Sequence, residues 1–504
     1  MEKLYYLGYR LSEIIPIRGR KMLNTSEKRE KIQETRELKR SLSARHLNMI
    51  AMGGSIGTGI FLALGDTIKE AGPGGALVAY GCIGIMVYFL ITSLGEMATF
   101  MPVTGSFETY ATKFIDPSLG FALGWNYWYN WAITVAAEMV ASGLVMKFWF
   151  PNVPAIVWSI GFLMLIVILN LLSTKAYGES EYWFASIKVI TVIIFIVIGL
   201  ANIIGIMGGE AVGFKNFTIG DAPFVGGAKS IFMIFLIAGF SFQGTELVGI
   251  AAGESEHPEK TIPKAIKTIF WRILLFYLGT IFVVGALVPY TEAGVERSPF
   301  TMVFERVGVS FAASLMNGVI LTSILSCGNS GMYASTRMLY AMAKDGKAPK
   351  FLSKVNKRGV TVNSLIATTL VSSVCFLTGV CAENTVYVWQ VAASGLAGFI
   401  SWLGIAVCHY RFRKAYIYQG MDLNKLKYKA KLFPLGPILA FILCIVVVLG
   451  QGLSYLQQET IDISGLIAAY IGIPIFIVLW MVYKVKHKTK IVSLEDVDLN
   501  TNHK

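Results

Sequence analysis

The sequence predicts an all-α integral membrane protein, on the basis of its composition, its apolar runs and the placement of its basic residues. Of the 504 residues, 55% are hydrophobic and only 15% are charged, whereas a soluble domain carries about 25% charged residues. A soluble fold of this length needs more polar surface than this chain can supply. The lipid bilayer is therefore the expected surroundings of most of the chain.

Twelve apolar runs predict twelve transmembrane helices. A helix rises about 1.5 Å per residue, so about 20 apolar residues cross a hydrocarbon core about 30 Å thick. The runs lie at residues 46–65, 75–99, 119–149, 155–173, 183–207, 226–251, 268–290, 309–340, 361–380, 385–409, 433–453 and 464–484.

The net charge of +13 is distributed unevenly between the two sides of the predicted membrane. With a cytoplasmic N-terminus, 38 of the 44 Lys and Arg residues lie inside, and this asymmetry is the one that orients membrane proteins. Both termini are therefore expected in the cytoplasm, and the basic clusters are interpreted as topology signals, with no nucleic-acid partner. The basic residues expected outside are Lys69, Lys147, Lys215, Lys229, Arg297 and Arg306.

The chain carries no pattern typical of an enzyme. The six cysteines are scattered without CxxC pairs and the five histidines form no ligand pattern, so neither a disulfide framework nor a metal site is expected. HExxH and phosphate-loop motifs are absent from the sequence, and the loops are too short for a nucleotide-binding domain. We expect no catalytic residue and no cofactor.

The first span contains an unusual run of glycines, GGSIGTGIF, from Gly53 to Phe61. Each glycine costs a helix interior about 0.8 to 1 kcal/mol relative to alanine. One interpretation is close helix packing, because Gly53 and Gly57 form a GxxxG pair. The other is a break in the helix, which at membrane depth is tolerated only where it is buried in protein or lines a cavity.

The sixth span is interrupted in the same way, and the two interruptions lie five spans apart. It reads AGFSFQGTELVGIAAGE from Ala238 to Glu254, with glycines among hydroxyl and amide side chains. Paired broken helices at corresponding places predict an inverted-repeat transporter whose substrate binds near the midplane. The expected segments are a cytosolic N-terminal arm (1–45), two five-helix repeats (46–207 and 226–409), helices eleven and twelve (433–484) and a cytosolic C-terminal tail (485–504).

The two breaks together favour an α-amino acid as the ligand. Unwinding at Gly57, Thr58 and Gly59 exposes amide donors at the start of a half-helix, where a carboxylate is favoured. The break around residues 240–244 offers carbonyl acceptors for an ammonium group. The binding residues expected from the two breaks are Ser55, Ile56, Gly57, Thr58, Gly59, Phe240, Ser241, Gln243, Gly244, Thr245 and Glu246.

Five ionisable residues lie in or beside the spans, where each costs several kcal/mol unless it is paired, and one of them, Glu246, directly follows the sixth-span break. Glu96 and Glu254 are expected near the cytoplasmic ends, in solvated or gate-forming positions. Glu138 lies well inside the third span, and an internal hydrogen bond is the alternative to a ligand contact. Lys188 is the only cation between residues 183 and 200, and the alternative to a functional role is extension of its side chain toward the cytosol.

Five motifs are spread along the sequence: SIGTGIF (55–61), AGPGGAL (71–77), SLGEMATFMPVTGSF (93–107), GESEYWFASIKV (178–189) and FSFQGTELVGIAAGE (240–254). They resemble, in the same order, motifs of the amino acid transporter family of the amino acid-polyamine-organocation (APC) superfamily. The resemblance runs from about Ser43 to Tyr483. Further stretches, such as CGNSGMYASTRMLY at residues 327–340 and DGKAPK at 345–350, are most similar to members that carry lysine.

The resemblance implies a LeuT-like 5+5 inverted repeat, with broken helices one and six and two additional C-terminal helices. Lys188 matches a fifth-span lysine suited to bind and release a transported proton. Glu246 is then the candidate partner for a cationic side chain, with Glu138, Asn130 and Ser394 shaping the pocket. The resemblance thus implies proton-driven import of L-lysine through alternating access.

Two alternatives stay open. Glu138 and Glu246 also match acidic positions in relatives that take aromatic amino acids, so the cargo can instead be a neutral, aromatic or γ-amino acid. A transporter-like sensor that signals through a membrane partner is the other alternative. In each case the expected partners are an amino acid, protons and the lipid bilayer, and the expected location is the plasma membrane, here a bacterial inner membrane.

Overall fold

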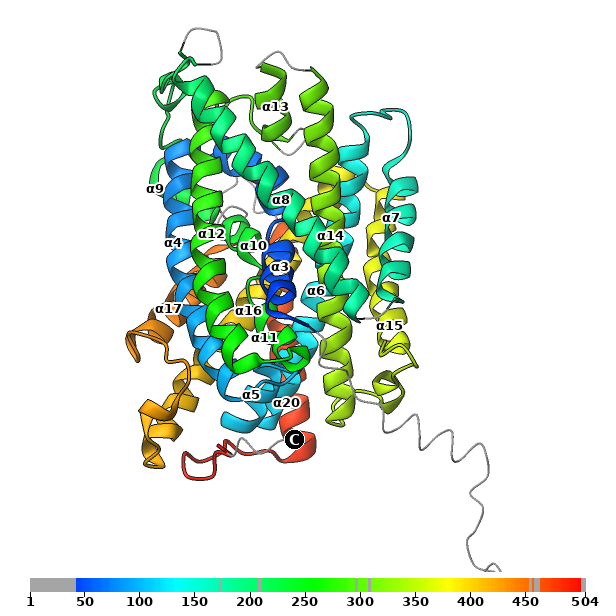
Figure 1. Ribbon diagram of the computed structural model, residues 1–504, viewed down its shortest axis with the longest axis vertical. Coiled ribbons are helices and arrows are strands. Elements are labelled where there is room, and N and C mark those ends of the chain that lie inside the picture. Colours follow the sequence, from blue (N-terminus) through cyan, green and yellow to red (C-terminus); the bar gives the residue numbers. More distant parts are fainter. Residues whose placement is uncertain are drawn as a thin grey trace, which may run out of the picture.

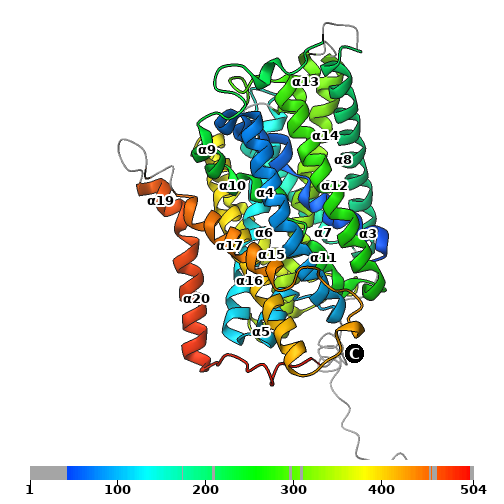
Figure 2. The same ribbon diagram turned by 90° about the vertical axis from the view of Figure 1, so that its left-hand side faces the viewer.

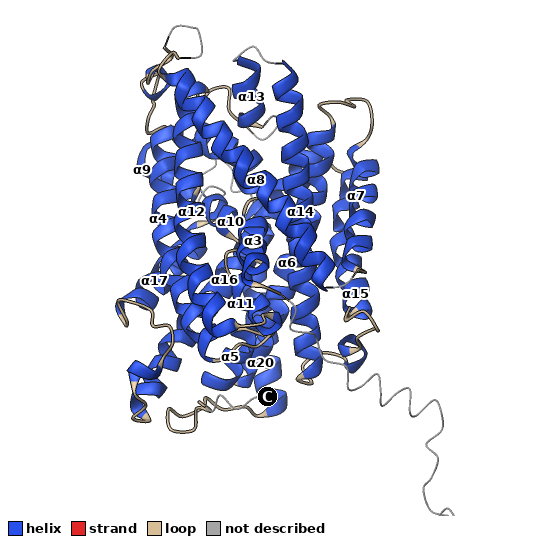
Figure 3. Ribbon diagram, in the orientation of Figure 1, coloured by secondary structure: helices blue, strands red, loops and turns tan. Residues whose placement is uncertain are grey.

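The computed structural model describes residues 42–172, 174–206, 211–294, 298–306, 310–452, 456 and 463–499. Within these ranges the only non-helical pairing is an isolated bridge between Leu42 and Ser255, and every other regular element is a helix. Figure 3 shows this helical architecture, and the all-α prediction is confirmed for the described residues. Residues 1–41 of the predicted N-terminal arm (1–45) lie outside the described residues.

Most of the long helices run along one common direction and form a bundle (Figure 1). The short helix α13 lies at one end of this bundle, and the C-terminus lies at the other. The helices are α3 (Ala44–Ser55), η1 (Gly59–Ala63), α4 (Leu64–Phe100), α5 (Phe107–Phe114), α6 (Pro117–Met146), α7 (Ala155–Asn170), α8 (Thr174–Ile203), η2 (Lys215–Phe217), α9 (Gly227–Met233), α10 (Phe235–Phe242), α11 (Leu247–Ala251), η3 (Ala252–Glu254), α12 (Pro258–Leu287), α13 (Pro299–Arg306), α14 (Ser310–Lys344), η4 (Lys350–Ser353), α15 (Val362–Ser372), η5 (Ser373–Gly379), α16 (Glu383–Tyr418), η6 (Leu423–Lys425), α17 (Leu435–Gly450), α19 (Ile463–Tyr470) and α20 (Gly472–His487).

Five helical stretches of the described chain are long and apolar enough to cross a membrane, judged by length and composition alone. Shorter apolar helices accompany them at Ala155–Asn170, Leu274–Leu287 and Leu435–Gly450. The number of twelve spans stays a prediction. The five stretches are Ala44–Phe100, Lys175–Ile203, Gly227–Glu254, Val362–Gly379 and Glu383–Tyr418.

A glycine and a proline divide the first of these stretches. Gly72 has a φ of +73°, which glycine adopts without strain, and Pro73 follows it inside α4. The amides of Gly74 and Gly75 donate instead to the carbonyl of Pro223, at 2.9 and 3.2 Å. The kink lies between the first two predicted spans, at residues 46–65 and 75–99, and turns the chain from one to the next.

The centre of the bundle is formed by α6, which packs against α14 and α16 and is buried along most of its length. Its first turn begins at Pro117, and the side chain of Asp116 caps it by accepting a hydrogen bond from the Ser118 amide at 2.8 Å. The outer helices α7 and α8 expose apolar side chains such as Met164 and Val197. Such exposed apolar surface fits a lipid environment.

The C-terminal region packs against the bundle. Figure 2 shows α19 and α20 along the outer edge of the bundle, and α20 contacts α6. Burial favours the neutral form of Asp116, but hydrogen bonds from Lys484, Ser118 and Thr489 outweigh it and lower the pKa of the Asp116 carboxyl to about 2. The described part of the predicted tail is therefore fixed to the start of α6.

Candidate functional site

The first helix is broken where the glycine run predicts it. α3 ends at Ser55, Ile56 leaves helical geometry, and the wider helix η1 begins at Gly59. In the gap, the amide and the hydroxyl of Thr58 both donate to Glu138 Oε1, at 3.4 and 3.1 Å. This break therefore already holds a carboxylate, which is the group that the exposed amide donors are predicted to favour.

The second break lies between α10 and α11. The chain is extended at Gln243, and Gly244 has a φ of +99°, a conformation that favours glycine. A Cβ atom added to Gly244 would lie 2.5 Å from the carbonyl carbon of Gly54, and one added to Gly59 would lie 2.6 Å from Ser241 Cα. The two breaks are therefore in direct contact, and glycine permits that contact.

A small cavity of about 10 Å³ lies between the breaks. A cavity of this volume has room for about one water molecule, so side chains or half-helices must move before an amino acid can enter. Seven of the predicted site residues line it: Ser55, Gly57, Gly59, Glu138, Phe240, Ser241 and Gln243. The other lining residues are Gly54, Trp131, Thr134 and Cys327.

Asn130, Ser394 and Thr245 were also predicted to form the pocket wall. They do not line this cavity but lie behind the residues that do. The Ser394 hydroxyl donates to Asn130 Oδ1 at 2.9 Å and lies 2.6 Å from the hydroxyl of Thr134. The side-chain amide of Gln243 donates through Nε2 to the Ser394 carbonyl at 3.2 Å. Thr245 is buried and bonds back to the end of α10. This network connects the second break to α6 and α16.

The carboxylate of Glu246 is fully engaged within the protein. It accepts hydrogen bonds from the Gly244 amide at 3.1 and 3.3 Å, from Tyr127 at 3.3 Å and from Trp402 at 3.4 Å. Glu246 is buried, and it is not among the residues that line the cavity. Its donors come from three elements, so in this state the carboxylate fixes the second break against α6 and α16.

Glu138, by contrast, presents an oxygen without a hydrogen-bond partner. Its side chain is buried and reaches the cavity from α6. Oε1 accepts the two hydrogen bonds from Thr58, so one oxygen has the predicted internal bond. Oε2 has no partner among the described atoms. A buried carboxylate oxygen of this kind is suited to accept a hydrogen bond from a cationic ligand.

Lys188 binds the end of α3. Its ammonium donates to the carbonyl oxygens of Gly53 and Ile56, at 2.6 and 2.8 Å. These carbonyls belong to the C-terminal turn of α3, where cations are favoured. The side chain has no exposed surface, so the alternative of extension toward the cytosol is wrong. The Lys188 ammonium therefore binds the same short segment, residues 53–56, at which the first helix breaks.

Three polar residues beside the breaks were not expected from the sequence. The hydroxyl of Tyr277 lies within hydrogen-bond distance of the carbonyls of both Ser55 and Ser241, to either of which it can donate, and so connects the two breaks. The thiol of Cys327 donates to the Gly54 carbonyl at 3.1 Å. Glu181, also buried, lies on α8 seven residues before Lys188. That spacing, which puts both on one helix face, was the available signal for Glu181.

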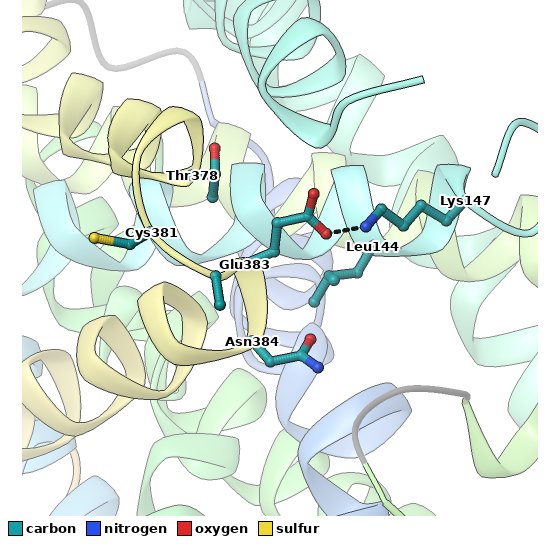
Figure 4. A pocket seen from close by; sticks show the side chains of 7 residues that line it. Leu144, Lys147, Thr378, Cys381, Glu383 and Asn384 are labelled. Carbon is teal, nitrogen blue, oxygen red and sulfur yellow. Dashed lines mark ion pairs between the residues drawn. The ribbon is translucent and has the colours of Figure 1, made fainter. Parts of the chain in front are cut away.

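A second cavity, of about 460 Å³, lies where the end of α6 meets the start of α16. Figure 4 shows Lys147 and Glu383 pointing toward each other there, as an ion pair. None of the predicted binding residues lines this cavity. The pair connects two helices that also border the small cavity between the breaks, at Glu138 and Ser394.

Comparison with known proteins gives a consistent result over nearly the whole chain. The chain is 53% identical to the lysine-specific permease LysP of Escherichia coli (strain K12), over 94% of this chain and 99% of that protein. It is 52% identical to LysP of Lactococcus lactis, covering 96% of each protein, and 49% identical to the histidine permease HisP of the same organism, covering 93% of this chain and 99% of HisP.

The family model described as amino acid permease matches residues 46–495. Family membership and the apolar helices together identify a multi-pass membrane protein. This chain belongs to the amino acid permease family.

Proposed function

We propose that this permease imports L-lysine by proton symport through alternating access. The observation that carries the proposal is the buried Glu138 carboxylate, one oxygen of which lies between two broken helices and has no partner among the described residues. The lysine-specific relatives support the same substrate. One positive charge that moves inward through 100 mV gains about 2.3 kcal/mol, or roughly fifty-fold in accumulation. A co-transported proton adds to this driving force.

The proposed architecture is a LeuT-like 5+5 inverted repeat of residues 46–207 and 226–409, followed by two further helices within 433–484. The direct contact between the breaks supports it, because inverted repeats bind substrate where two discontinuous helices meet. In this arrangement residues 1–45 and 485–504 are cytosolic, and the protein lies in the bacterial plasma membrane.

The substrate carboxylate binds the first break in this proposal, and the cationic side chain pairs with Glu138. Thr58 already donates two hydrogen bonds to a carboxylate, which supports anion recognition by this segment. The carbonyl groups of residues 240–244 are the proposed acceptors for the α-ammonium group. Glu246 stays a candidate contact for the cation after the site opens.

Lys188 is the proposed proton carrier. Its ammonium bonds two carbonyls at the end of α3, beside Thr58 and the predicted carboxylate site. Loss of the proton turns the ammonium into an amine, which keeps fewer donors and no charge for the helix end. Release of the proton therefore loosens the end of α3, and this links protonation to the conformation of the first break.

A histidine cargo is the second candidate, because the chain is 49% identical to a histidine permease. Purified protein in liposomes, with the inside negative and the outside acidic, tests both candidates by uptake of radiolabelled lysine. Arginine, histidine, phenylalanine, alanine and γ-aminobutyrate serve as competitors. Uptake that a protonophore abolishes and only basic amino acids inhibit supports the lysine proposal. Binding without transport identifies a sensor instead.

Gly57→Val is expected to reduce lysine uptake at least ten-fold. A Cβ atom at Gly57 would lie 2.7 Å from Cys327 Sγ and 2.8 Å from Glu138 Oε1, so valine fills the space between the break and the carboxylate. Gly81→Val is the matched control, because a Cβ atom at Gly81 meets nothing within 4 Å. Uptake is normalised to the amount of monodisperse protein. Equal uptake by the two variants would contradict a functional break at Gly57.

Glu246→Gln is expected to lower transport of lysine and of its neutral analogue norleucine to a similar degree, by about ten-fold. The reason is that the carboxylate accepts hydrogen bonds from Gly244, Tyr127 and Trp402, and an amide group cannot accept all of them. The measurement is competition by each compound against labelled lysine in liposomes. A loss confined to lysine would instead assign Glu246 to direct pairing with the cationic side chain.

A further inference from the structure

We propose that Glu181 is the buried counter-charge of Lys188 and acts as a positioning residue that keeps Lys188 protonated until the transport cycle requires release. The inference rests on the proposed coupling role of Lys188. It assigns a function to a carboxylate that touches neither the cavity nor the predicted substrate contacts.

The two charged side chains converge on one glycine of α3. Glu181 and Lys188 are seven residues apart on α8, so they lie on the same helix face two turns apart. The ammonium of Lys188 donates to the Gly53 carbonyl at 2.6 Å. A Cβ atom added to Gly53 would lie only 2.2 Å from Glu181 Oε1. Gly53 therefore makes room for the carboxylate beside the carbonyl that binds the ammonium.

The hydrogen bonds of Glu181 suit an ionised carboxylate. The hydroxyl of Ser326 donates to Oε1, and Asn329 Nδ2 donates to Oε2 at 3.4 Å. Asn170 fixes the orientation of the Asn329 amide, because its own Nδ2 donates to Asn329 Oδ1 at 2.7 Å. The Asn329 Nδ2 group can only donate, and the hydroxyls of Ser326 and Ser330 are able to donate, so the surroundings of Glu181 suit an ionised carboxylate. The side chain has no exposed surface, so this negative charge needs a buried cation.

Among the described residues, Lys188 is the cation that can balance the buried charge of Glu181. The titratable groups that interact with the pair are Tyr177 from α8, Cys327 from α14 and Glu138 from α6, and the Arg337–Glu254 ion pair lies beyond Tyr177. From α3, His46 contacts Glu179 on α8 instead.

The chemical step leaves Glu181 unchanged. When Lys188 releases its proton to solvent, the ammonium becomes an amine, while Glu181 keeps its negative charge throughout. Deprotonation therefore leaves a buried anion without a counter-charge, and that cost favours the protonated form of Lys188. Removal of the Glu181 charge should make Lys188 lose its proton at a lower pH.

The test is the pH dependence of lysine uptake by the Glu181→Gln variant in liposomes. The midpoint of acid-stimulated uptake is expected to move about one pH unit to the acid side, with the KM for lysine at acid pH within about two-fold of the original protein. Gly53→Ala, which displaces the carboxylate, is expected to shift it in the same direction. Glu179→Gln is the matched control, because Glu179 pairs with Arg45 and His46 and should leave the midpoint unchanged.

The outcomes separate the two proposals. If uptake by the original protein ignores both pH and a protonophore, the proton-symport proposal fails. If uptake is proton-driven and the Glu181→Gln midpoint is unchanged, or activity falls equally at every pH, the counter-charge inference is overturned. Should Glu181→Gln yield no monodisperse protein, Gly53→Ala decides, and Glu181→Asp, which retains the charge, should preserve the midpoint.

Discussion

Glu138→Gln is expected to reduce the preference for lysine over norleucine by about 100-fold. Norleucine has the same backbone and a side chain of similar length, but it lacks the ammonium group. In the present state Oε2 of Glu138 is buried and has no partner in the described part of the chain, so it can accept a hydrogen bond from a cationic group. Removal of one member of a buried charge pair costs about 2 to 5 kcal/mol, and 100-fold in binding corresponds to about 2.7 kcal/mol.

Competition against labelled lysine in liposomes measures this preference directly, with both compounds tested on the original protein and the variant. Glutamine keeps the size of the side chain and can still accept hydrogen bonds from Thr58 through its amide oxygen. Glu383→Gln supplies a control carboxylate on α16, since Glu383 pairs with Lys147 away from the breaks. An unchanged ratio in the Glu138 variant would show that the cation binds elsewhere, and Glu246 would be the next candidate.

The positions of the two breaks could be predicted from the sequence because glycine is unfavourable inside a buried helix unless its backbone has another task. Gly57 and Gly244 illustrate this, since both lie where α-helical geometry stops. What the sequence did not predict is that the breaks touch each other. That contact depends on the packing of Gly244 against Gly54 and of Gly59 against Ser241, which are distant in the chain.

The residues that sequence reasoning missed share a physical cause. Glu181 precedes the predicted fifth span by two residues and so looks like part of a solvated loop, whereas α8 begins at Thr174 and buries it. Tyr277 lies in an apolar run, where its ring alone explains its presence. Its hydroxyl gains a role only because the fold brings the Ser55 and Ser241 carbonyls to it. Long-range partners of this kind leave no local pattern.

The same limit applies to Glu138 and Glu246. Both were predicted to lie at the site, but the sequence could not say which of them faces the cavity. The difference is made by their donors, because Glu246 accepts hydrogen bonds from Tyr127 and Trp402 on other helices. Oε1 of Glu138 accepts from Thr58, and Oε2 has no hydrogen-bond partner among the described residues.

Lys188→Ala is expected to abolish uphill lysine accumulation while exchange of internal for external lysine persists. Alanine removes the ammonium that donates to Gly53 and Ile56, so the proposed proton carrier is lost from the end of α3. Exchange needs the substrate-loaded protein to change conformation but needs no net proton movement. The two activities are measured in the same liposomes, with and without an imposed pH gradient and membrane potential.

Two further variants distinguish coupling from structural support. Lys188→Arg keeps a positive charge that does not titrate in the accessible range, so exchange should continue and the response to a pH gradient should be lost. Lys175→Ala removes an exposed cation near the start of the same helix and should leave both activities intact. Uphill accumulation at the original level in Lys188→Ala would exclude this lysine as the proton carrier and leave Glu138 as the buried titratable group at the breaks to test next.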